Sequence, residues 1–170
     1  GRKGKIKILE SIRQMKVDAG EGNSLYVHLT LLPWIDRVGE MKTKPTQHSV
    51  KELTGLGIQP DVLLLRCDRQ IDEKIRDKVA LFCNVDRRSV IPCLDVPNIC
   101  HLPLALEHEG LHARITEKLG IWTGAPNLSP WQKAATTPDN FKTSITVAMV
   151  GKYAGLADSY KSVSYPHPTR

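Results

Sequence analysis

Aromatic residues, paired cysteines and long apolar runs are all scarce in this 170-residue sequence. Phe, Trp and Tyr make up 5% of the chain, too few for the stacked platforms that bind single-stranded nucleic acid. The cysteines, Cys67, Cys83, Cys93 and Cys100, form no CxxC pair, which argues against zinc ribbons and thioredoxin-type redox sites. No run approaches the roughly 18 apolar residues that a bilayer span requires. We therefore expect no nucleic-acid partner, no membrane span, and reduced, buried thiols.

The overall composition is typical of a globular domain that binds anions. Hydrophobic residues account for 41% and charged residues for 25% of the chain, close to the averages of soluble domains. The net charge is +6, the isoelectric point lies near 9.2, and the basic residues are spread among 18 acidic ones. Phosphorylated small molecules fit this balance at least as well as nucleic acids. The basic residues 1–7 precede an amphipathic pattern and no apolar signal region, so we expect a cytoplasmic chain.

The apolar pattern predicts alternating strands and helices. Three near-continuous apolar runs are typical of strands covered on both faces of a parallel sheet: residues 25–33, 62–67 and 89–96. Pro92 places the third run at a sheet edge or a bulge. Helical spacing marks the segments before and between them: residues 8–16, 45–53 and 71–82. This alternation predicts an α/β fold with a layered parallel sheet of the Rossmann or P-loop type.

Composition divides the chain into three parts. Residues 1–121 carry the alternating pattern and form the first domain. Residues 122–140 are rich in Gly, Pro, Thr, Asn and Trp and lack periodicity, which predicts a linker. Residues 141–170 contain an apolar run at 145–150 and the expected start of a helix near 156–163. Because these elements cannot form a core alone, we interpret them as the beginning of a second α/β domain.

The HExxH pattern of zinc hydrolases occurs at His108, Glu109 and His112. It binds zinc only on a continuous helix, because the two histidines must lie one turn apart. Gly110 falls inside the pattern and is expected to end one helix before the next begins. Two short helices are predicted on either side of Gly110: residues 103–109 and 111–119. A polar helix end is the favoured interpretation, and a zinc hydrolase remains the alternative.

The most informative stretch is Lys-Thr-Lys-Pro-Thr-Gln at residues 42–47. Pro45 at a first helical position predicts a helix N-terminus, and Lys42 and Lys44 directly precede it. Free backbone N–H groups, the helix dipole and two ammonium groups then act on one small region, which favours an anion such as a phosphate. Neighbouring side chains could read sugar or base atoms: Thr43, Thr46, Gln47 and Ser49. The alternative is a solvated basic loop.

Other polar residues carry weaker signals. Lys74, Arg76 and Lys78 on the next predicted helix either add to a phosphate site or only keep an exposed face soluble. His28 lies inside an apolar run, where a hydrogen-bonded core histidine is more common than a catalytic one. A Gly-rich phosphate loop, a GxSxG nucleophile and a Cys-His arrangement are all missing from the sequence. From these residues alone, the chain is an α/β fragment with one candidate phosphate site.

At residues 42–53, KTKPTQHSVKEL, the chain closely resembles CTP synthase, the glutamine-dependent amidoligase. Further segments match in the family's order: LESIRQM at 9–15, VHLTL at 27–31, GIQPD at 57–61, ALFCNV at 80–85, DV at 95–96, VGKY at 150–153 and DSYKSV at 158–163. The resemblance implies that residues 1–121 are the C-terminal part of the amidoligase domain. It also implies that residues 141–170 are the start of a class I glutaminase domain.

The resemblance implies a reaction and a set of binding residues. In the full enzyme, ATP with Mg²⁺ phosphorylates UTP, and ammonia released from glutamine displaces the phosphate to give CTP. UTP or CTP binding is implied for Lys42, Thr43, Lys44, Pro45, Thr46, Gln47 and Lys78, and ATP binding near the adenine for Leu94, Asp95 and Val96. The intact enzyme is implied to be a homotetramer with the pyrimidine nucleotide at a subunit interface. A triphosphate carries about four negative charges, which lysines at a helix N-terminus offset.

Two departures from the family bear on activity. Residues 1–7 stand where the family has an acidic segment that contacts metal and nucleotide, so we expect no magnesium ligand there. The family's phosphate loop and the glutaminase Cys, His and Glu have no counterpart, and residues 164–170 replace an expected helix. We interpret both ends as a gene fragment or a misread frame. The chain alone is therefore expected not to form CTP, and a non-catalytic nucleotide-binding or subunit-interface module is the alternative.

Overall fold

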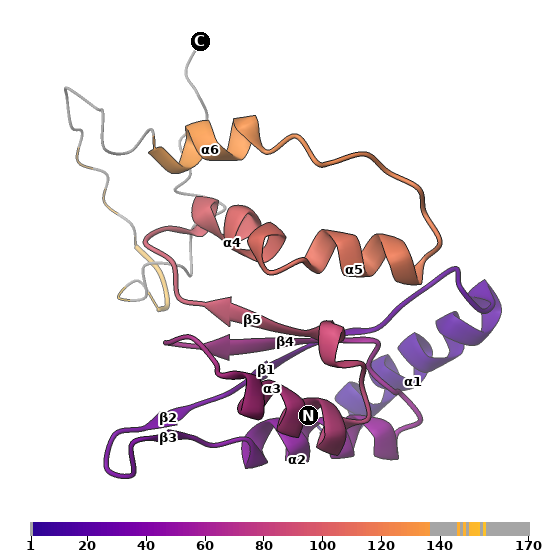
Figure 1. The fold of residues 1–170 in the computed structure, drawn as a ribbon. Coiled ribbons are helices and arrows are strands. Elements are labelled where there is room, and N and C mark those ends of the chain that lie inside the picture. Colours follow the sequence, from indigo (N-terminus) through magenta and orange to yellow (C-terminus); the bar gives the residue numbers. More distant parts are fainter. Residues whose placement is uncertain (1, 137–145, 147, 149, 154, 156–170) are drawn as a thin grey trace. The chain divides into compact units, whose positions relative to one another are not determined.

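The computed structural model describes residues 2–136, 146, 148, 150–153 and 155 (Figure 1). The chain separates into two units, residues 1–137 and residues 138–170. All the helices and strands given below lie in the first unit. The helix expected at 156–163 lies outside the described residues, and so do residues 145, 147 and 149 of the strand expected at 145–150.

A three-stranded parallel sheet is the centre of the first unit. Its strands are β1 (Val27–Leu31), β4 (Val62–Cys67) and β5 (Val90–Leu94), in the order β1-β4-β5. Helix α2 (Lys44–Gly55) connects β1 to β4, and α3 (Glu73–Cys83) connects β4 to β5. Figure 1 shows α2 and α3 on one face of this sheet, and the later helices on the other. The predicted α/β fold with a parallel sheet is confirmed.

The main hydrophobic core lies between the sheet and the pair α2 and α3. Leu63 and Leu65 of β4 and Val90 of β5 are fully buried, and they share a cluster with Val50 of α2 and Val79 of α3. Each fully buried aliphatic side chain contributes about 1.5–3 kcal/mol. The alternation on β4 follows from the pleat, which sends every second side chain toward the same helices.

Strand β1 differs from the prediction that both faces are covered. Val27, Leu29 and Leu31 point to the face opposite α2 and are 43%, 58% and 55% exposed. On the other face, Thr30 is buried. The prediction was wrong for this strand because the apolar pattern does not say which neighbours are present, and β1 is an edge strand in the described part of the chain. The prediction that Pro92 lies at an edge is confirmed, because β5 is the opposite edge.

The remaining elements before β5 are short, apart from the first helix. Helix α1 spans Arg2–Ala19, longer than the predicted residues 8–16. Strands β2 (Trp34–Ile35) and β3 (Glu40–Met41) form an antiparallel hairpin between β1 and α2. A 3-10 turn, η1 (Arg87–Ser89), leads into β5.

The helices after β5 are separated at Gly110, as predicted. The 3-10 turn η2 (Ile99–His101) precedes α4 (Leu102–His108) and α5 (Leu111–Lys118). Gly110 separates the two helices at a φ of 82°, a left-handed conformation that favours glycine. None of the described helices combines the length and the apolar character needed to cross a bilayer.

Residues 122–140 contain a helix that the linker prediction does not include. Helix α6 spans Ser129–Thr136. Ala135 is buried, and the side-chain amide of Asn98 donates a hydrogen bond to its carbonyl over 3.3 Å. Asn127 accepts a hydrogen bond from the backbone N–H of Ser129, which is an Asx-type start for the helix. Sequence analysis missed this helix because its eight residues give only a short, weak apolar pattern.

Candidate functional site

The N-terminus of α2 is the predicted anion site, and the predicted helix is confirmed. Lys44 is the first helical residue and Pro45 follows it. Thr43 precedes the helix without a side-chain cap. The backbone N–H of Gln47 is the first to bond within the helix, donating to the Thr43 carbonyl over 3.0 Å. The earlier N–H groups of this turn have no partner inside the helix, which leaves the positive end of its dipole open to an anion.

Two threonines hold this turn from inside. The Thr46 hydroxyl donates to the Leu31 carbonyl over 3.0 Å, and its side chain is fully buried. Thr43 is 4% exposed, and its hydroxyl accepts a hydrogen bond from the Gln47 amide over 3.0 Å. The expectation that these hydroxyls read a sugar or base is therefore not what their contacts favour, because both are engaged within the protein. Gln47 remains partly exposed beside them.

Lys42 and Lys78 act on one carboxylate, that of Glu40 in strand β3. Lys42 forms an ion pair with Glu40, and its backbone N–H donates to the Pro33 carbonyl over 2.9 Å. The hydrogen bond from Lys42 lowers the pKa of Glu40, and the charge of Lys78 adds to this effect. The fold therefore brings Lys78 of α3 near the charged residues of the β2–β3 hairpin. The sequence pattern alone did not decide whether Lys78 would lie there. Sequence analysis missed Glu40, although its position two residues before Lys42 was a visible signal.

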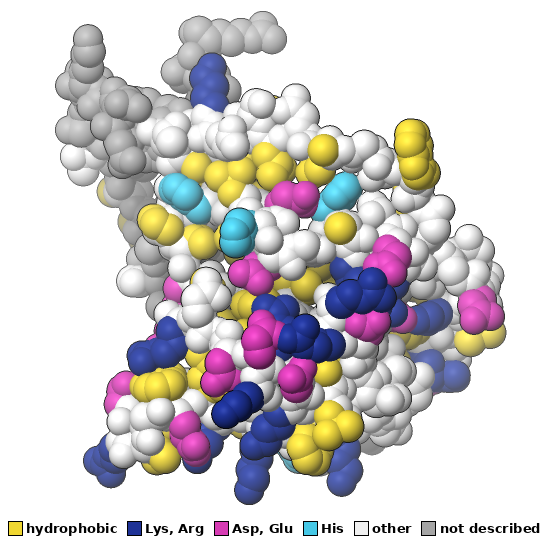
Figure 2. All heavy atoms as spheres, in the orientation of Figure 1, with side chains coloured by type: hydrophobic (Ala, Val, Ile, Leu, Met, Phe, Trp, Pro, Cys, Tyr) yellow, Lys and Arg dark blue, Asp and Glu magenta, His cyan; other side chains and the backbone are white. Residues whose placement is uncertain are grey.

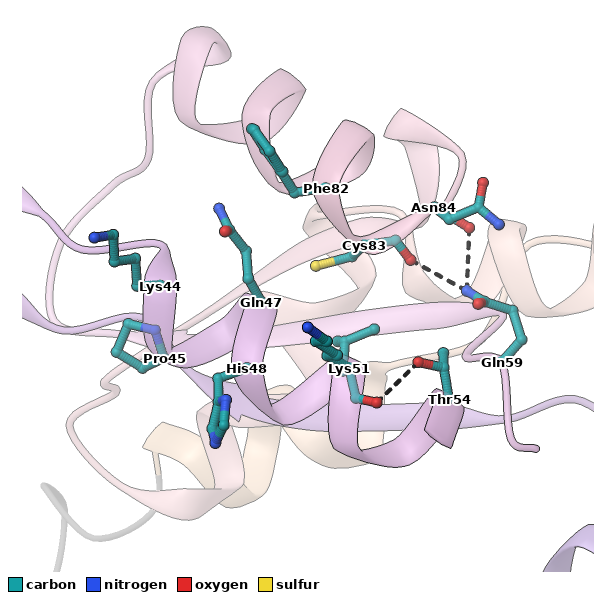
Figure 3. Close-up of a pocket in the computed structure, with 11 residues that line it drawn as sticks. Lys44, Pro45, Gln47, His48, Lys51, Thr54, Gln59, Phe82, Cys83 and Asn84 are labelled. Carbon is teal, nitrogen blue, oxygen red and sulfur yellow. Dashed lines mark hydrogen bonds between the residues drawn. The ribbon is translucent and has the colours of Figure 1, made fainter. Parts of the chain in front are cut away.

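An open groove begins at Lys44 and runs between α2 and the end of α3 (Figure 3). Its volume is about 800 Å³. Figure 3 shows Gln47 extending from α2 toward Phe82, with Lys51 one turn further along. At the far end, the Gln59 amide donates to the carbonyls of Cys83 and Asn84, each over 3.1 Å. The groove thus joins a cationic end to an amide-lined end. The sequence pattern gave no sign of it, because it depends on how two helices pack.

The residues predicted to contact ATP lie at the end of β5. Leu94 ends the strand and packs against the core, and Val96 is partly buried. The exposed Asp95 lies 3.6 Å from Arg66 of β4 and donates its backbone N–H to the Cys67 carbonyl. In parallel sheets, ligands bind beyond the carboxyl ends of the strands. Both predicted nucleotide segments lie at this edge, since β1 also ends there, next to α2.

The charged residues of α3 are largely paired. In the lower half of Figure 2, Lys and Arg side chains lie among acidic ones. Arg87 forms ion pairs with Glu73 and with Asp77, and Arg76 lies 4.0 Å from Glu73. Arg76 therefore belongs to an ion-pair network. Lys74 and Lys78 are exposed.

The HExxH pattern is divided between two helices. His108 ends α4 and is largely exposed, while His112 lies on α5 beyond the left-handed Gly110. Glu109 is directed to Arg76, 3.6 Å away. The two imidazoles are thus not placed on one continuous helix as zinc binding requires. Among the described residues, no group of three His, Cys, Asp or Glu side chains lies close enough to hold a metal ion.

His28 and the cysteines occupy the interior places expected of them. His28 Nε2 lies 2.8 Å from Ser49 Oγ, and partial burial lowers the pKa of its ring. Cys67 and Cys83 are buried free thiols whose pKa values burial raises to about 11. Cys100 is buried and Cys93 partly buried, also without disulfides. The raised pKa values keep the Cys67 and Cys83 thiols protonated, and therefore weakly reactive, near neutral pH.

Comparisons with known proteins agree on one family. A family model described as "CTP synthase N-terminus" matches residues 1–121. A CTP synthase of Pelobacter propionicus is 52% identical over 162 residues, which are 94% of this chain and 30% of the relative. CTP synthases of Geobacter sulfurreducens and Methanococcus maripaludis are 50% and 51% identical over 160 and 158 residues, covering 94% and 93% of this chain and 30% of each relative.

These matches define which part of the family is present. The chain spans about 30% of the length of the curated relatives that it matches. The matched region is described as the N-terminus of CTP synthase, which corrects the narrower prediction that residues 1–121 are the C-terminal part of the amidoligase domain. With the family model covering most of the chain and half of the aligned residues identical, the chain belongs to the CTP synthase family.

Proposed function

We propose that the chain carries part of the pyrimidine nucleotide site of a CTP synthase. In the whole enzyme, UTP would be phosphorylated by ATP and then aminated with nitrogen from glutamine to give CTP, ADP, phosphate and glutamate. The site for UTP or the product CTP would comprise Lys42, Thr43, Lys44, Pro45, Thr46, Gln47 and Lys78. Within it, the two threonine hydroxyls would hold the turn and would not contact the ligand. The reaction of nucleoside triphosphates also favours a location in the cytoplasm.

The observation that carries the proposal is the open N-terminus of α2 with its lysines. Lys44 stands at the first helical position, Lys42 forms an ion pair with Glu40, and Lys78 lies near enough to help lower the pKa of Glu40. Three ammonium groups against one carboxylate leave a net positive charge next to unpaired backbone N–H groups. A polyphosphate can satisfy both, because each oxygen accepts hydrogen bonds and each negative charge is offset.

The remaining substrate assignments rest on the family and on the sheet edge. ATP would lie near Leu94, Asp95 and Val96, at the carboxyl end of β5 and therefore at the same edge as α2. Mg²⁺ is expected to accompany the nucleotides, but the described residues do not form a set of ligands for it, so we assign it no residue here. A homotetramer, the linker at 122–140 and the start of a glutaminase domain at 141–170 are part of the same proposal.

Titration of UTP into the purified chain, followed by calorimetry, tests the proposal. We expect Lys42→Ala and Lys44→Ala each to weaken UTP binding about tenfold, through loss of one charge-assisted hydrogen bond. Lys74→Ala is the control for the loss of an exposed lysine, because Lys74 is exposed and is not among the residues proposed to bind the nucleotide. Equal affinity of the two lysine variants and the wild-type chain would contradict the proposed site.

A non-catalytic interface module is the second candidate. The exposed apolar side chains of β1 favour it, because Val27, Leu29 and Leu31 form a row that a packed neighbour would cover. This candidate predicts no response to UTP. An assay for CTP from UTP, ATP and glutamine completes the comparison: we expect no product from this chain alone, and measurable CTP would show that expectation to be wrong.

A further inference from the structure

Two polar contacts join α2 to β1. The hydroxyl of Thr46 donates to the carbonyl of Leu31 over 3.0 Å, and His28 Nε2 lies 2.8 Å from Ser49 Oγ. Thr46 is fully buried, and His28 and Ser49 are partly buried. The two contacts involve residues three apart on the strand, His28 and Leu31, and residues three apart on the helix, Thr46 and Ser49. Because residues i and i+3 lie on one face of a helix, both contacts can form together.

These contacts determine how far α2 can slide along the sheet. Apolar contacts such as that of Val50 are non-directional and tolerate small shifts of a helix. Hydrogen bonds are directional, and a shift that breaks them leaves the Thr46 hydroxyl and the His28 ring without partners in a site with little water. The pair therefore specifies one register of α2 on β1.

The register of α2 sets the position of its cationic end. Lys44 and Gln47 belong to the same two helical turns as Thr46 and Ser49, but they face the groove. We propose that His28, through its hydrogen bond to Ser49, is a positioning residue that fixes this register and thereby places Lys44 and Gln47 against the polyphosphate of a nucleotide. The identity of the ligand as a nucleotide rests on the proposed function, whereas the contact between His28 and Ser49 is independent of it.

Hydrogen–deuterium exchange on the full 170-residue chain measures how firmly α2 is held in this register, because amides exchange when the helix opens locally. In His28→Phe and in Ser49→Ala, we expect the amides of residues 47–50 to exchange at least about fivefold faster, while those of α3 keep their rates. The double variant should exchange no faster than either single variant, because one shared bond is lost. His28→Gln, which keeps a hydrogen-bonding group at a similar reach, should restore slow exchange. Ser11→Ala, which removes an exposed hydroxyl on α1, is the control for a serine lost from a helix.

Calorimetry with inorganic tripolyphosphate and, in parallel, with UTP measures the consequence. We expect His28→Phe and Ser49→Ala to weaken tripolyphosphate binding about three- to tenfold, and His28→Gln to recover most of it. Unchanged exchange in residues 47–50, equal acceleration in α3, or unchanged tripolyphosphate affinity in His28→Phe would overturn the positioning role. If tripolyphosphate binds as expected and UTP does not bind any variant, the positioning role stands and the proposed function fails.

Discussion

Two clusters of basic residues in this chain are built in opposite ways. At the entry of α2, the charges of Lys42 and Lys78 act on one carboxylate, Glu40, and the described residues give no ion pair to Lys78 or to Lys44, which begins the helix. Around η1 and α5, four arginines meet five carboxylates: Arg76, Arg87, Arg88 and Arg114 with Glu73, Asp77, Asp86, Glu109 and Glu117. The first cluster has charge left over for a ligand, and the second is balanced within the protein.

Burial separates the two clusters further. The Arg114 side chain is 8% exposed and bonds to Ser89, Asp86 and Glu117 at 2.7, 3.1 and 2.8 Å. The lysines of the first cluster are partly or fully exposed. A cavity of about 390 Å³ lies beside the arginines, yet each of its charges already has a partner. A cavity lined with arginines is therefore not by itself an anion site. The N-terminus of α2, where most of the lysines lack ion-pair partners within the described residues, is the better candidate.

The largest expected effect is on folding, at the balanced cluster. Arg114→Ala should lower the free energy of unfolding by about 3 kcal/mol, because it leaves the buried Ser89 hydroxyl and two carboxylates without their shared partner. Urea unfolding followed by circular dichroism gives this value. Arg88→Ala, at an exposed side chain of the same network, should cost no more than about 0.5 kcal/mol. Similar losses in both variants would contradict the distinction between buried and exposed pairs.

The next effect is on binding, at the uncompensated cluster. Lys78→Ala should weaken UTP binding by about 1 kcal/mol, or about fivefold, while the midpoint of thermal unfolding stays within a degree or two. Lys74→Ala on the same helix should change neither quantity. Because the attraction is electrostatic, the difference between the two variants should shrink in high salt. A loss of stability in Lys78→Ala would mean that Lys78 belongs to the structural kind of cluster instead.

A third effect is the pH dependence of stability at His28. Burial lowers the pKa of the folded ring below its ordinary value near 6.5. Between the folded pKa and that ordinary value, the unfolded chain binds more protons than the folded chain, so stability rises with pH. The free energy of unfolding should therefore fall as the pH falls below about 6.5, and His28→Gln should remove this component. Chemical unfolding between pH 5 and 8 measures it; identical profiles in both chains would exclude His28 as the source.

Local sequence signals predicted much of the sheet, its helices and the helix N-terminus at which the candidate site is proposed. Ile71, Ile75 and Val79 recur at four-residue steps, and α3 forms there. Pro45 marks the start of α2 because a fixed φ and a missing N–H cost nothing in a first turn. These signals depend on residues within one or two helical turns, so they can be interpreted without knowledge of the rest of the fold.

Features that depend on distant residues escaped prediction. The pairing of Arg114 with Asp86 joins residues that only the packing of α5 against η1 brings together. The exposed face of β1 depends on which strands lie beside it, and the pattern of Leu29 and Leu31 is the same whether covered or not. Glu40 was missed because two lysines nearby suggested a purely basic site, although a carboxylate among them changes its net charge.

The smallest expected effect comes from that carboxylate. Glu40 lies close to Lys42 and feels the charge of Lys78, so it competes with a phosphate for the same ammonium groups. Glu40→Gln keeps the size of the side chain and removes the competing charge. Because exposed ion pairs contribute less than about 1 kcal/mol, tripolyphosphate binding should tighten only about twofold, without a change in unfolding free energy beyond about 0.5 kcal/mol. Calorimetry at low ionic strength resolves such a change. Weaker binding in Glu40→Gln would show that the carboxylate serves the ligand, and the entry of α2 would then be a balanced cluster like that of the arginines.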